Sequence, residues 1–253
     1  MYQIPEPTYC SKYPKEKRDI IARLVGASKI FQSGKTEITA LQKTHLDLKK
    51  GELILVIGPS GSGKTTLLSL LGCVLYPTEG CVCINDVRTN ELNDREMAEL
   101  RLKNIGFVFQ NFNLITPLNA EENIMVPMML NNISKEMINR KIDKTLDLLG
   151  IRQRSKSMPS QLSGGEQQRV AIARAMVNDP PIILCDEPTA ALDLKSIDIV
   201  LQELRDLADG GKAVAVVTHD LRLTEYADRI ISIENGKISE KHKGNKENGK
   251  SVE

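Results

Sequence analysis

An apolar run that ends in a glycine-rich loop constrains the fold most. Leu53–Ile57 is apolar throughout, which is typical of a strand buried on both faces of a parallel sheet. A segment with helical spacing of leucines, Thr65 to Leu75, comes after the loop. A bare glycine-rich turn is the alternative, and the flanking strand and helix disfavour it. The loop fits G-x-x-x-x-G-K-[ST] at each fixed position, and its residues are Gly58, Pro59, Ser60, Gly61, Ser62, Gly63, Lys64 and Thr65.

This pattern predicts an ATP phosphate site. The glycines permit backbone angles and close approaches that a β-carbon would block. Backbone N–H groups at the start of the helix, Thr66 included, then face the phosphates, where the helix dipole favours negative charge. Lys64 adds a positive charge to the phosphate oxygens, and the Thr65 hydroxyl is a ligand for Mg²⁺.

Three more apolar runs lie late in the chain, at 182–185, 213–217 and 230–233, with helical stretches between them. This alternation predicts a parallel sheet with right-handed crossovers. Asp186 and Glu187 follow the first of these runs. The Asp186 carboxylate is expected to hold Mg²⁺ through its hydration shell, and Glu187 to orient or deprotonate the attacking water. Two adjacent buried acids without a cation would be costly, which disfavours a purely structural role.

A second motif, Leu162-Ser163-Gly164-Gly165-Glu166, opens another helix and is a second anion site at a helix N-terminus. Together with the phosphate loop, Asp186-Glu187, Gln110 and His219, it resembles the ATP-binding subunits of ABC transporters, over roughly residues 22–240. The resemblance implies an α/β P-loop NTPase fold: a RecA-like core with a mostly parallel sheet, an N-terminal antiparallel β subdomain and an inserted α-helical lobe.

The expected organisation follows from this resemblance and from composition. Residues 1–20 are predicted to be an irregular extension, 21–240 the nucleotide-binding domain, and 241–253 a flexible polar tail. Two β-prone runs, 20–25 and 36–48, open the domain, and the second is broken near Gln42-Lys43. Residues 111–165 are rich in helical periodicity and are predicted to form the lobe. Within it, Ser134 is expected to cap a helix that Gly150 stops.

The resemblance also assigns roles to individual residues. Gln110 is implied to contact Mg²⁺ or the attacking water, and His219 the γ-phosphate. A glutamine alone would more often be a surface residue, and a histidine alone at a strand end would more often be structural. Phe31 stands where the family has an aromatic residue that stacks on adenine, although phenylalanine is also an ordinary core residue. Asp193 resembles an interface contact of the family. The residues implied to bind ATP held by a second subunit are Leu162, Ser163, Gly164, Gly165, Glu166 and Asp193.

These features predict an ATPase that uses ATP and Mg²⁺, works as a head-to-tail dimer, and powers a membrane permease on another chain. Glu99-Leu100-Arg101 and the stretch 105–114 are similar to ATPases of lipoprotein-releasing systems, macrolide exporters and antimicrobial-peptide resistance exporters. That branch implies export or mechanical transmission. The apolar run Met125–Leu130 has two interpretations, a permease-docking groove or ordinary packing of the lobe. A soluble ABC-type ATPase is the alternative function; a single cassette and the short spacing between the two motifs disfavour it.

Charge and hydropathy exclude other classes. With 34 basic and 33 acidic residues, the chain lacks the field of a nucleic-acid-binding protein. It has neither an apolar run of the roughly 18–20 residues that span a bilayer nor a secretory signal, so we expect it on the cytoplasmic face of the plasma membrane, held there by its permease. Five scattered cysteines without C-x-x-C spacing disfavour a metal site at Cys81 and Cys83, which are expected to alternate along a short β segment in a reducing compartment.

Overall fold

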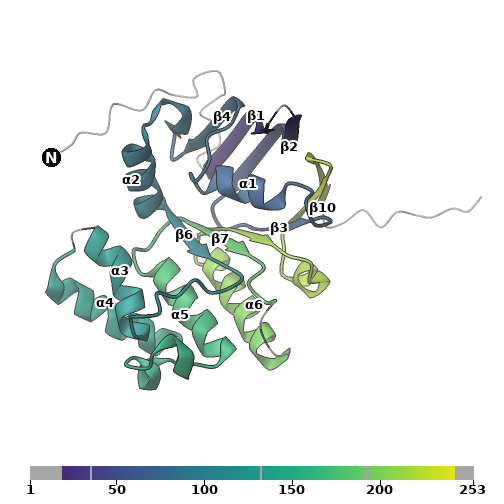
Figure 1. The fold of residues 1–253 in the computed structure, drawn as a ribbon. Coiled ribbons are helices and arrows are strands. Elements are labelled where there is room, and N and C mark those ends of the chain that lie inside the picture. The colour runs from purple at the N-terminus through teal and green to yellow at the C-terminus, as the bar shows by residue number, and fades with distance from the viewer. Residues whose placement is uncertain (1–18, 35, 132, 191, 193, 243–253) are drawn as a thin grey trace, which may run out of the picture.

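Two β-sheets and the helices around them make up the fold (Figure 1). The computed structural model describes residues 19–34, 36–131, 133–190, 192 and 194–242. Most of the predicted N-terminal extension and C-terminal tail, residues 1–18 and 243–253, therefore lies outside the described residues. The smaller sheet has the strand order β2-β1-β4-β5, and the larger one β10-β9-β3-β8-β7-β6.

The strands are β1 (Ile20–Ser33), β2 (Thr36–Lys49), β3 (Leu53–Ile57), β4 (Glu79–Ile84), β5 (Val87–Arg88), β6 (Ile105–Val108), β7 (Ile182–Asp186), β8 (Ala213–Val217), β9 (Arg229–Glu234) and β10 (Lys237–His242). The α-helices are α1 (Lys64–Leu71), α2 (Asp94–Asn104), α3 (Ala120–Leu130), α4 (Lys135–Leu148), α5 (Gly164–Met176) and α6 (Leu194–Asp209). Short 3₁₀ helices lie at η1 (Thr89–Glu91), η2 (Arg152–Arg154), η3 (Pro159–Gln161) and η4 (Leu221–Glu225).

The larger sheet is parallel except for its edge strand β10, as the alternation of apolar runs and helices predicts. Successive residues of β3 pack on opposite faces: Leu53 and Leu55 join one hydrophobic core, Ile54 and Val56 the other. Strands β7 and β8 alternate in the same way. Both faces are therefore buried, which explains why these strands are apolar without interruption.

The two cores give the molecule its layers. One core lies between the larger sheet, α1, α2 and the antiparallel sheet; the other lies between the larger sheet and α3, α4, α5 and α6. In Figure 1, α1 and the antiparallel sheet lie above the larger sheet, and α3 to α6 lie below it. The predicted fold class, with its antiparallel β subdomain and helical lobe, is confirmed.

The antiparallel sheet departs from the predicted strand limits. The first strand was expected to end at Val25, but β1 continues to Ser33 past Gly26, which has a φ of 56°. The second was expected to break near Gln42-Lys43. Strand β2 runs on to Lys49, yet the pairing shifts there: Leu41 faces Lys29, and Thr44 faces Ala27. The predicted break is therefore a β-bulge, in which β2 has one more residue than the facing part of β1.

The helical lobe follows its capping signals. The Ser134 side chain accepts a hydrogen bond from the Met137 N–H at the start of α4, and Gly150, with a φ of 62°, follows the end of that helix. Both predicted signals are confirmed. Two smaller differences concern element ends: α1 stops at Leu71 rather than Leu75, because Gly72 caps it, and β10 extends to His242, into the segment predicted as tail.

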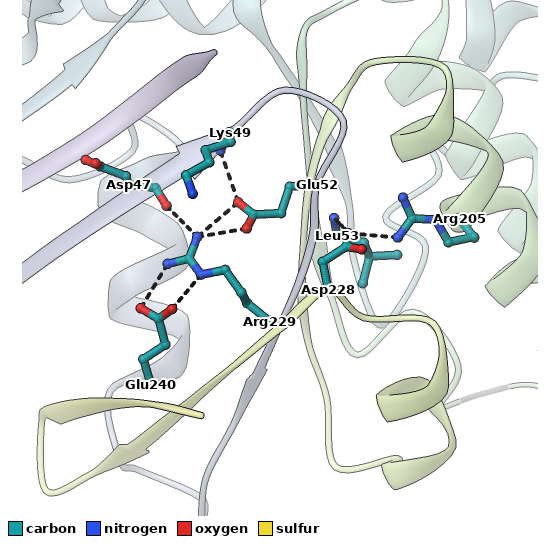
Figure 2. Close-up of polar contacts among 8 residues, drawn as sticks. All are labelled: Asp47, Lys49, Glu52, Leu53, Arg205, Asp228, Arg229 and Glu240. Carbon is teal, nitrogen blue, oxygen red and sulfur yellow. Dashed lines mark hydrogen bonds and ion pairs between the residues drawn. The ribbon is translucent and has the colours of Figure 1, made fainter. Parts of the chain in front are cut away.

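A buried ion network fastens the amino-terminal ends of the parallel strands (Figure 2). The Arg229 guanidinium donates to Glu52 Oε1 at 2.9 Å, to Glu240 Oε1 at 2.8 Å and to the Asp47 carbonyl at 3.1 Å. The two carboxylates raise the pKa of Arg229. Beside this network, Asp228 accepts from the Leu53 N–H and from Arg205, both at 2.8 Å. Arg229 thereby joins the starts of β3 and β9 to the ends of β2 and β10.

Replacing Arg229 with methionine should destabilise the protein by about 3 kcal/mol, because it leaves the Glu52 carboxylate desolvated without its partner. The side chains of Arg229 and Glu52 are only 12% and 10% exposed. Urea denaturation followed by circular dichroism measures the change. Arg152→Met is the matched control, since Arg152 also pairs with two carboxylates, Asp143 and Asp147, but at an exposed position. Equal losses in the two variants would show that the Arg229 network has no special stabilising role.

Candidate functional site

The phosphate loop lies at the carboxyl end of β3, directly before α1. Neighbouring backbone leaves no room for a side chain at two of its glycines, Gly58 and Gly63. A Cβ on Gly58 would lie 2.2 Å from the Ile233 carbonyl oxygen, and one on Gly63 would lie 2.3 Å from the Ala40 carbonyl oxygen. Gly63 is also the N-cap of α1, with a φ of 109°. The loop is therefore pressed between β3, β2 and β9, and its shape is set by these contacts.

Lys64 is buried within this loop. Its ammonium donates to the Gly58 carbonyl at 2.8 Å and to the Pro59 carbonyl at 2.9 Å. Only 7% of the residue is exposed. Thr65 is exposed and Thr66 half-buried in the same first turn of α1. The loop thus gathers a charged ammonium, a hydroxyl and a helix N-terminus at one place, which suits a phosphate group.

The two strands β7 and β8 bring Glu187 and His219 together. The Glu187 N–H donates to the Val217 carbonyl at 2.8 Å, which fixes the end of β7 against the end of β8. The His219 N–H donates to Glu187 Oε2 at 3.2 Å, and His219 Nε2 lies 3.2 Å from Glu187 Oε1. That Oε1 atom is buried and accepts no hydrogen bond from a described residue. A carboxylate oxygen with an unfilled acceptor position is the group that a general base uses to take a proton from water.

The backbone at Glu187 is unusual. Its φ is 48°, in the left-handed region that residues other than glycine seldom adopt. Such conformations cost free energy and gather at functional sites. Here the conformation lets the carboxylate meet the His219 backbone on the next strand. The structure thus brings the predicted general base and the predicted histidine into contact.

Asp186 lies one residue earlier, half-buried at the end of β7. Desolvation raises the pKa of its carboxyl, and the neighbouring charge of Glu187 raises it further, whereas Lys64 lowers it. The Lys64 charge therefore acts on Asp186 across the β3–β8–β7 edge. A divalent cation beside Asp186 would act in the same direction as Lys64 and favour the ionised carboxylate.

The donor set suits Mg²⁺ rather than a metal held by protein alone. The described residues contain no group of three His, Cys, Asp or Glu side chains placed to hold an ion. Asp186 and Thr65 offer hard oxygen atoms, and Mg²⁺ takes one or two protein ligands together with phosphate and water oxygens. Gln110, the third predicted ligand, is exposed in the turn that follows β6, the strand beside β7.

Ser163 begins the second helix N-terminus. It is the N-cap of α5: its side chain accepts from the Glu166 N–H, and its N–H donates to the Glu166 carboxylate at 2.8 Å. That backbone bond, together with Arg154, lowers the pKa of Glu166. Ser163 is exposed, whereas Leu162 and Gly165 are buried and Gly164 is half-buried. Helix α5 packs on the opposite face of the larger sheet from α1, so this cap and the phosphate loop belong to different layers.

Two other predicted site residues have different outcomes. Phe31 lies in β1, paired with Ile38, and is 38% exposed. The Lys29 ammonium lies 5.3 Å from its ring centroid. This exposure is compatible with a stacking surface. Asp193 lies outside the described residues.

A groove of about 610 Å³ separates the helical lobe from the core. Its lining includes Phe107, Phe109, Val126, Pro127 and Leu130. Two residues of α3 are instead buried in the core: Met128 within the run Met125–Leu130, and Ile124 just before it. One face of α3 therefore packs in the core and another lines the groove. Docking of a permease there stays a prediction. The stacked pair of Phe107 and Phe109, with ring centroids 5.4 Å apart, was not predicted.

Comparisons with known proteins agree with this geometry. The family model described as ABC transporter matches residues 41–190. An uncharacterised ABC transporter ATP-binding protein of Methanocaldococcus jannaschii, MJ0796, is 43% identical over 226 residues, 87% of this chain and 96% of that protein. A dimeric structure of the same cassette in a post-hydrolysis state, bound to ADP and Pi, superposes with a TM-score of 0.82 over 88% of this chain and 98% of that chain, at 42% identity.

The macrolide export ATP-binding/permease protein MacB of Bartonella henselae is 40% identical over 223 residues. This match covers 88% of the present chain but only 34% of MacB. The predicted branch is thereby confirmed. Among the described residues, no helix has the length and hydropathy to span a membrane. The chain belongs to the ABC transporter family, as an ATP-binding subunit that hydrolyses ATP to power a membrane transporter.

Proposed function

We propose that the chain binds Mg-ATP at Gly58–Thr65 and hydrolyses it with Glu187 as the base. The contact between Glu187 and His219 at the ends of β7 and β8 carries this proposal. It places the Glu187 carboxylate beside His219, at the ends of the two strands that follow β3 in the larger sheet.

In this mechanism the loop N–H groups and Lys64 bind the phosphates and offset the charge that develops on them. Glu187 orients the attacking water and accepts its proton, and His219 helps hold that water near the γ-phosphate. Asp186, Thr65 and Gln110 would hold Mg²⁺, which neutralises phosphate charge when bound. The remaining residues position these groups.

Glu187→Gln should keep ATP binding but lower turnover by at least about a hundredfold, because general-base catalysis contributes on that scale. The amide keeps the size and an acceptor oxygen but does not take a proton. Phosphate release measures turnover, and titration of a fluorescent ATP analogue measures binding. Hydrolysis at the parental rate would remove Glu187 from the proposed role.

We further propose that two copies enclose ATP, each using Leu162–Glu166 and Asp193 on the nucleotide held by the other. One chain carries two helices that begin in glycine-rich motifs, α1 and α5, and they lie in different layers. Lys64 and the acids lie near α1 alone. The similar cassette of M. jannaschii is dimeric, which supports this arrangement.

In the Glu187→Gln background, Ser163→Asp should raise the ATP concentration needed for dimer formation by at least about tenfold, because a like charge would face the phosphate. Ser163→Asn is the matched control: both residues are good N-caps, so α5 keeps its start, but asparagine is neutral. Light scattering with and without ATP measures the dimer. Equal dimer formation by the two variants would contradict a phosphate contact at Ser163.

We also propose that Phe31 stacks on adenine. Phe31→Ala should weaken ATP binding by about 1–2 kcal/mol, the scale of base–aromatic stacking. Phe31→Tyr retains the ring and should bind nearly as the parent does. Competition of ATP with the fluorescent analogue gives both affinities. A folded alanine variant with parental affinity would refute the stacking role.

The partner that fits the groove between core and lobe is a membrane permease on another chain, which would hold this subunit at the cytoplasmic face of the membrane. Similarity to proteins named for macrolide export supports an exporting partner. Inside-out vesicles test the direction, since an exporter would carry its cargo into them. No nucleic-acid partner is proposed.

Leu130→Asp should abolish co-purification with the permease while leaving ATP hydrolysis by the isolated subunit unchanged. Leu130 is the last residue of α3, lines the groove and is 65% exposed. Leu148→Asp is the control, because Leu148 ends α4, is 68% exposed and does not line the groove. Loss of the permease in both variants, or in neither, would contradict docking at this groove.

A further inference from the structure

The tip of the β9–β10 hairpin touches the phosphate loop. A two-residue turn, Asn235-Gly236, joins the strands, with Glu234 paired to Lys237. Their φ values are 49° and 74°, as in the turn that asparagine-glycine pairs favour. This tip lies at the end of the hairpin opposite to Arg229, and its Gly236 is buried. Ion pairs of Arg229 therefore hold the base of the hairpin, and the tip contacts the phosphate loop.

Gly236 forms two backbone hydrogen bonds to different parts of the molecule. Its N–H donates to the Ser62 carbonyl at 2.9 Å, and its carbonyl accepts from the Gln42 N–H at 2.7 Å. The Gln42 side chain also donates to the Asn235 carbonyl at 2.9 Å. The turn is thus held by β2 on one side and itself holds the phosphate loop on the other.

The bond to Ser62 constrains more than one carbonyl. The Ser62 carbonyl and the Gly63 N–H belong to one planar peptide, and no described peptide is cis. In a trans peptide these two groups point in opposite directions. Because the carbonyl points to Gly236, the Gly63 N–H must face away from the hairpin. Rotating this peptide would break the bond to Gly236.

Packing reinforces the same position. A Cβ on Gly63 would lie 2.3 Å from the Ala40 carbonyl oxygen and 3.6 Å from the Gly236 Cα. A Cβ on Gly236 would lie 3.2 Å from the Ala40 carbonyl oxygen and 3.3 Å from the Gln42 nitrogen. Ala40, Gly63 and Gly236 therefore meet with no room for a side chain. Any group added at Gly236 must move the turn, the strand or the loop.

We propose that Gly236 is a positioning residue for ATP: by holding the Ser62 carbonyl, it aims the Gly63 N–H at a nucleotide phosphate. Gln42 supports this role by holding the turn. Neither residue touches the nucleotide. The inference rests on the proposed assignment of Gly58–Thr65 as the phosphate site.

Gly236→Ala in the full chain should raise the Kd for ATP about tenfold, the loss expected when a charge-assisted hydrogen bond is misaligned. The KM should rise with it, while kcat at saturating ATP stays within about twofold, because the N–H binds the ground and transition states alike. Gly150→Ala is the matched control: Gly150 has a φ of 62°, against 74° for Gly236, and a Cβ there meets nothing within 4 Å. It should lower the melting temperature comparably and leave Kd and KM within about twofold of the parent.

A second variant, Gln42→Ala, tests the same role even if Gly236→Ala does not fold. Gln42→Ala removes one side-chain donor without backbone strain and should raise Kd about threefold, in line with one neutral hydrogen bond. Parental Kd in the folded variants of both Gly236 and Gln42 would overturn the inference. Lys64→Ala distinguishes failure of the Gly236 role from failure of the phosphate-site assignment. If Lys64→Ala abolishes ATP binding, Gly58–Thr65 is the phosphate site and only the role of Gly236 fails. If Lys64→Ala binds ATP as the parent does, the site assignment itself fails.

Discussion

Burial of β3 on both faces is the constraint on which the other features depend. Its residues Leu53 to Val56 are at most 1% exposed and alternate between two cores, so this strand leaves no surface for polar chemistry along its length. Polar groups are confined to its ends, where backbone and side chains meet solvent. Parallel neighbours share this limit, and their carboxyl ends lie at one edge. The phosphate loop, Glu187 and His219 therefore come together although more than a hundred residues separate the first from the second.

At the opposite edge of the sheet, where the amino ends of the parallel strands lie, the charged side chains form ion pairs with one another. There Arg229 pairs with the buried Glu52 and with Glu240, whose side chain is 33% exposed (Figure 2). These ion pairs hold the strands together. The same sheet thus carries compensated charge at its amino end and uncompensated acceptors at its carboxyl end.

The central strands and α4 were predictable because their signals are local. A strand that is buried on both faces must be apolar, and the capping residues Ser134 and Gly150 mark the two ends of α4. The antiparallel strands were less predictable: the last three residues of β1 and the first four of β2 are exposed, so burial imposes little pattern on that part of their sequence. The candidate site residues were recognised from motifs, which record chemistry at short spacing. Contacts such as Gly236 with Ser62 and Arg229 with Glu52 join residues far apart in the chain, and neither residue type announces its partner. Only packing in three dimensions identifies them.

The hydrogen bonds of Lys64 have a consequence for the strength of nucleotide binding. A lysine ammonium has three donors. Two of those on Lys64 go to the carbonyls of Gly58 and Pro59, so the remaining one has a fixed direction. A long flexible side chain ordinarily loses rotamer freedom when it grasps an anion, and that loss weakens binding. In this loop the folding of the protein has already ordered the side chain, so a larger share of the electrostatic attraction appears as affinity.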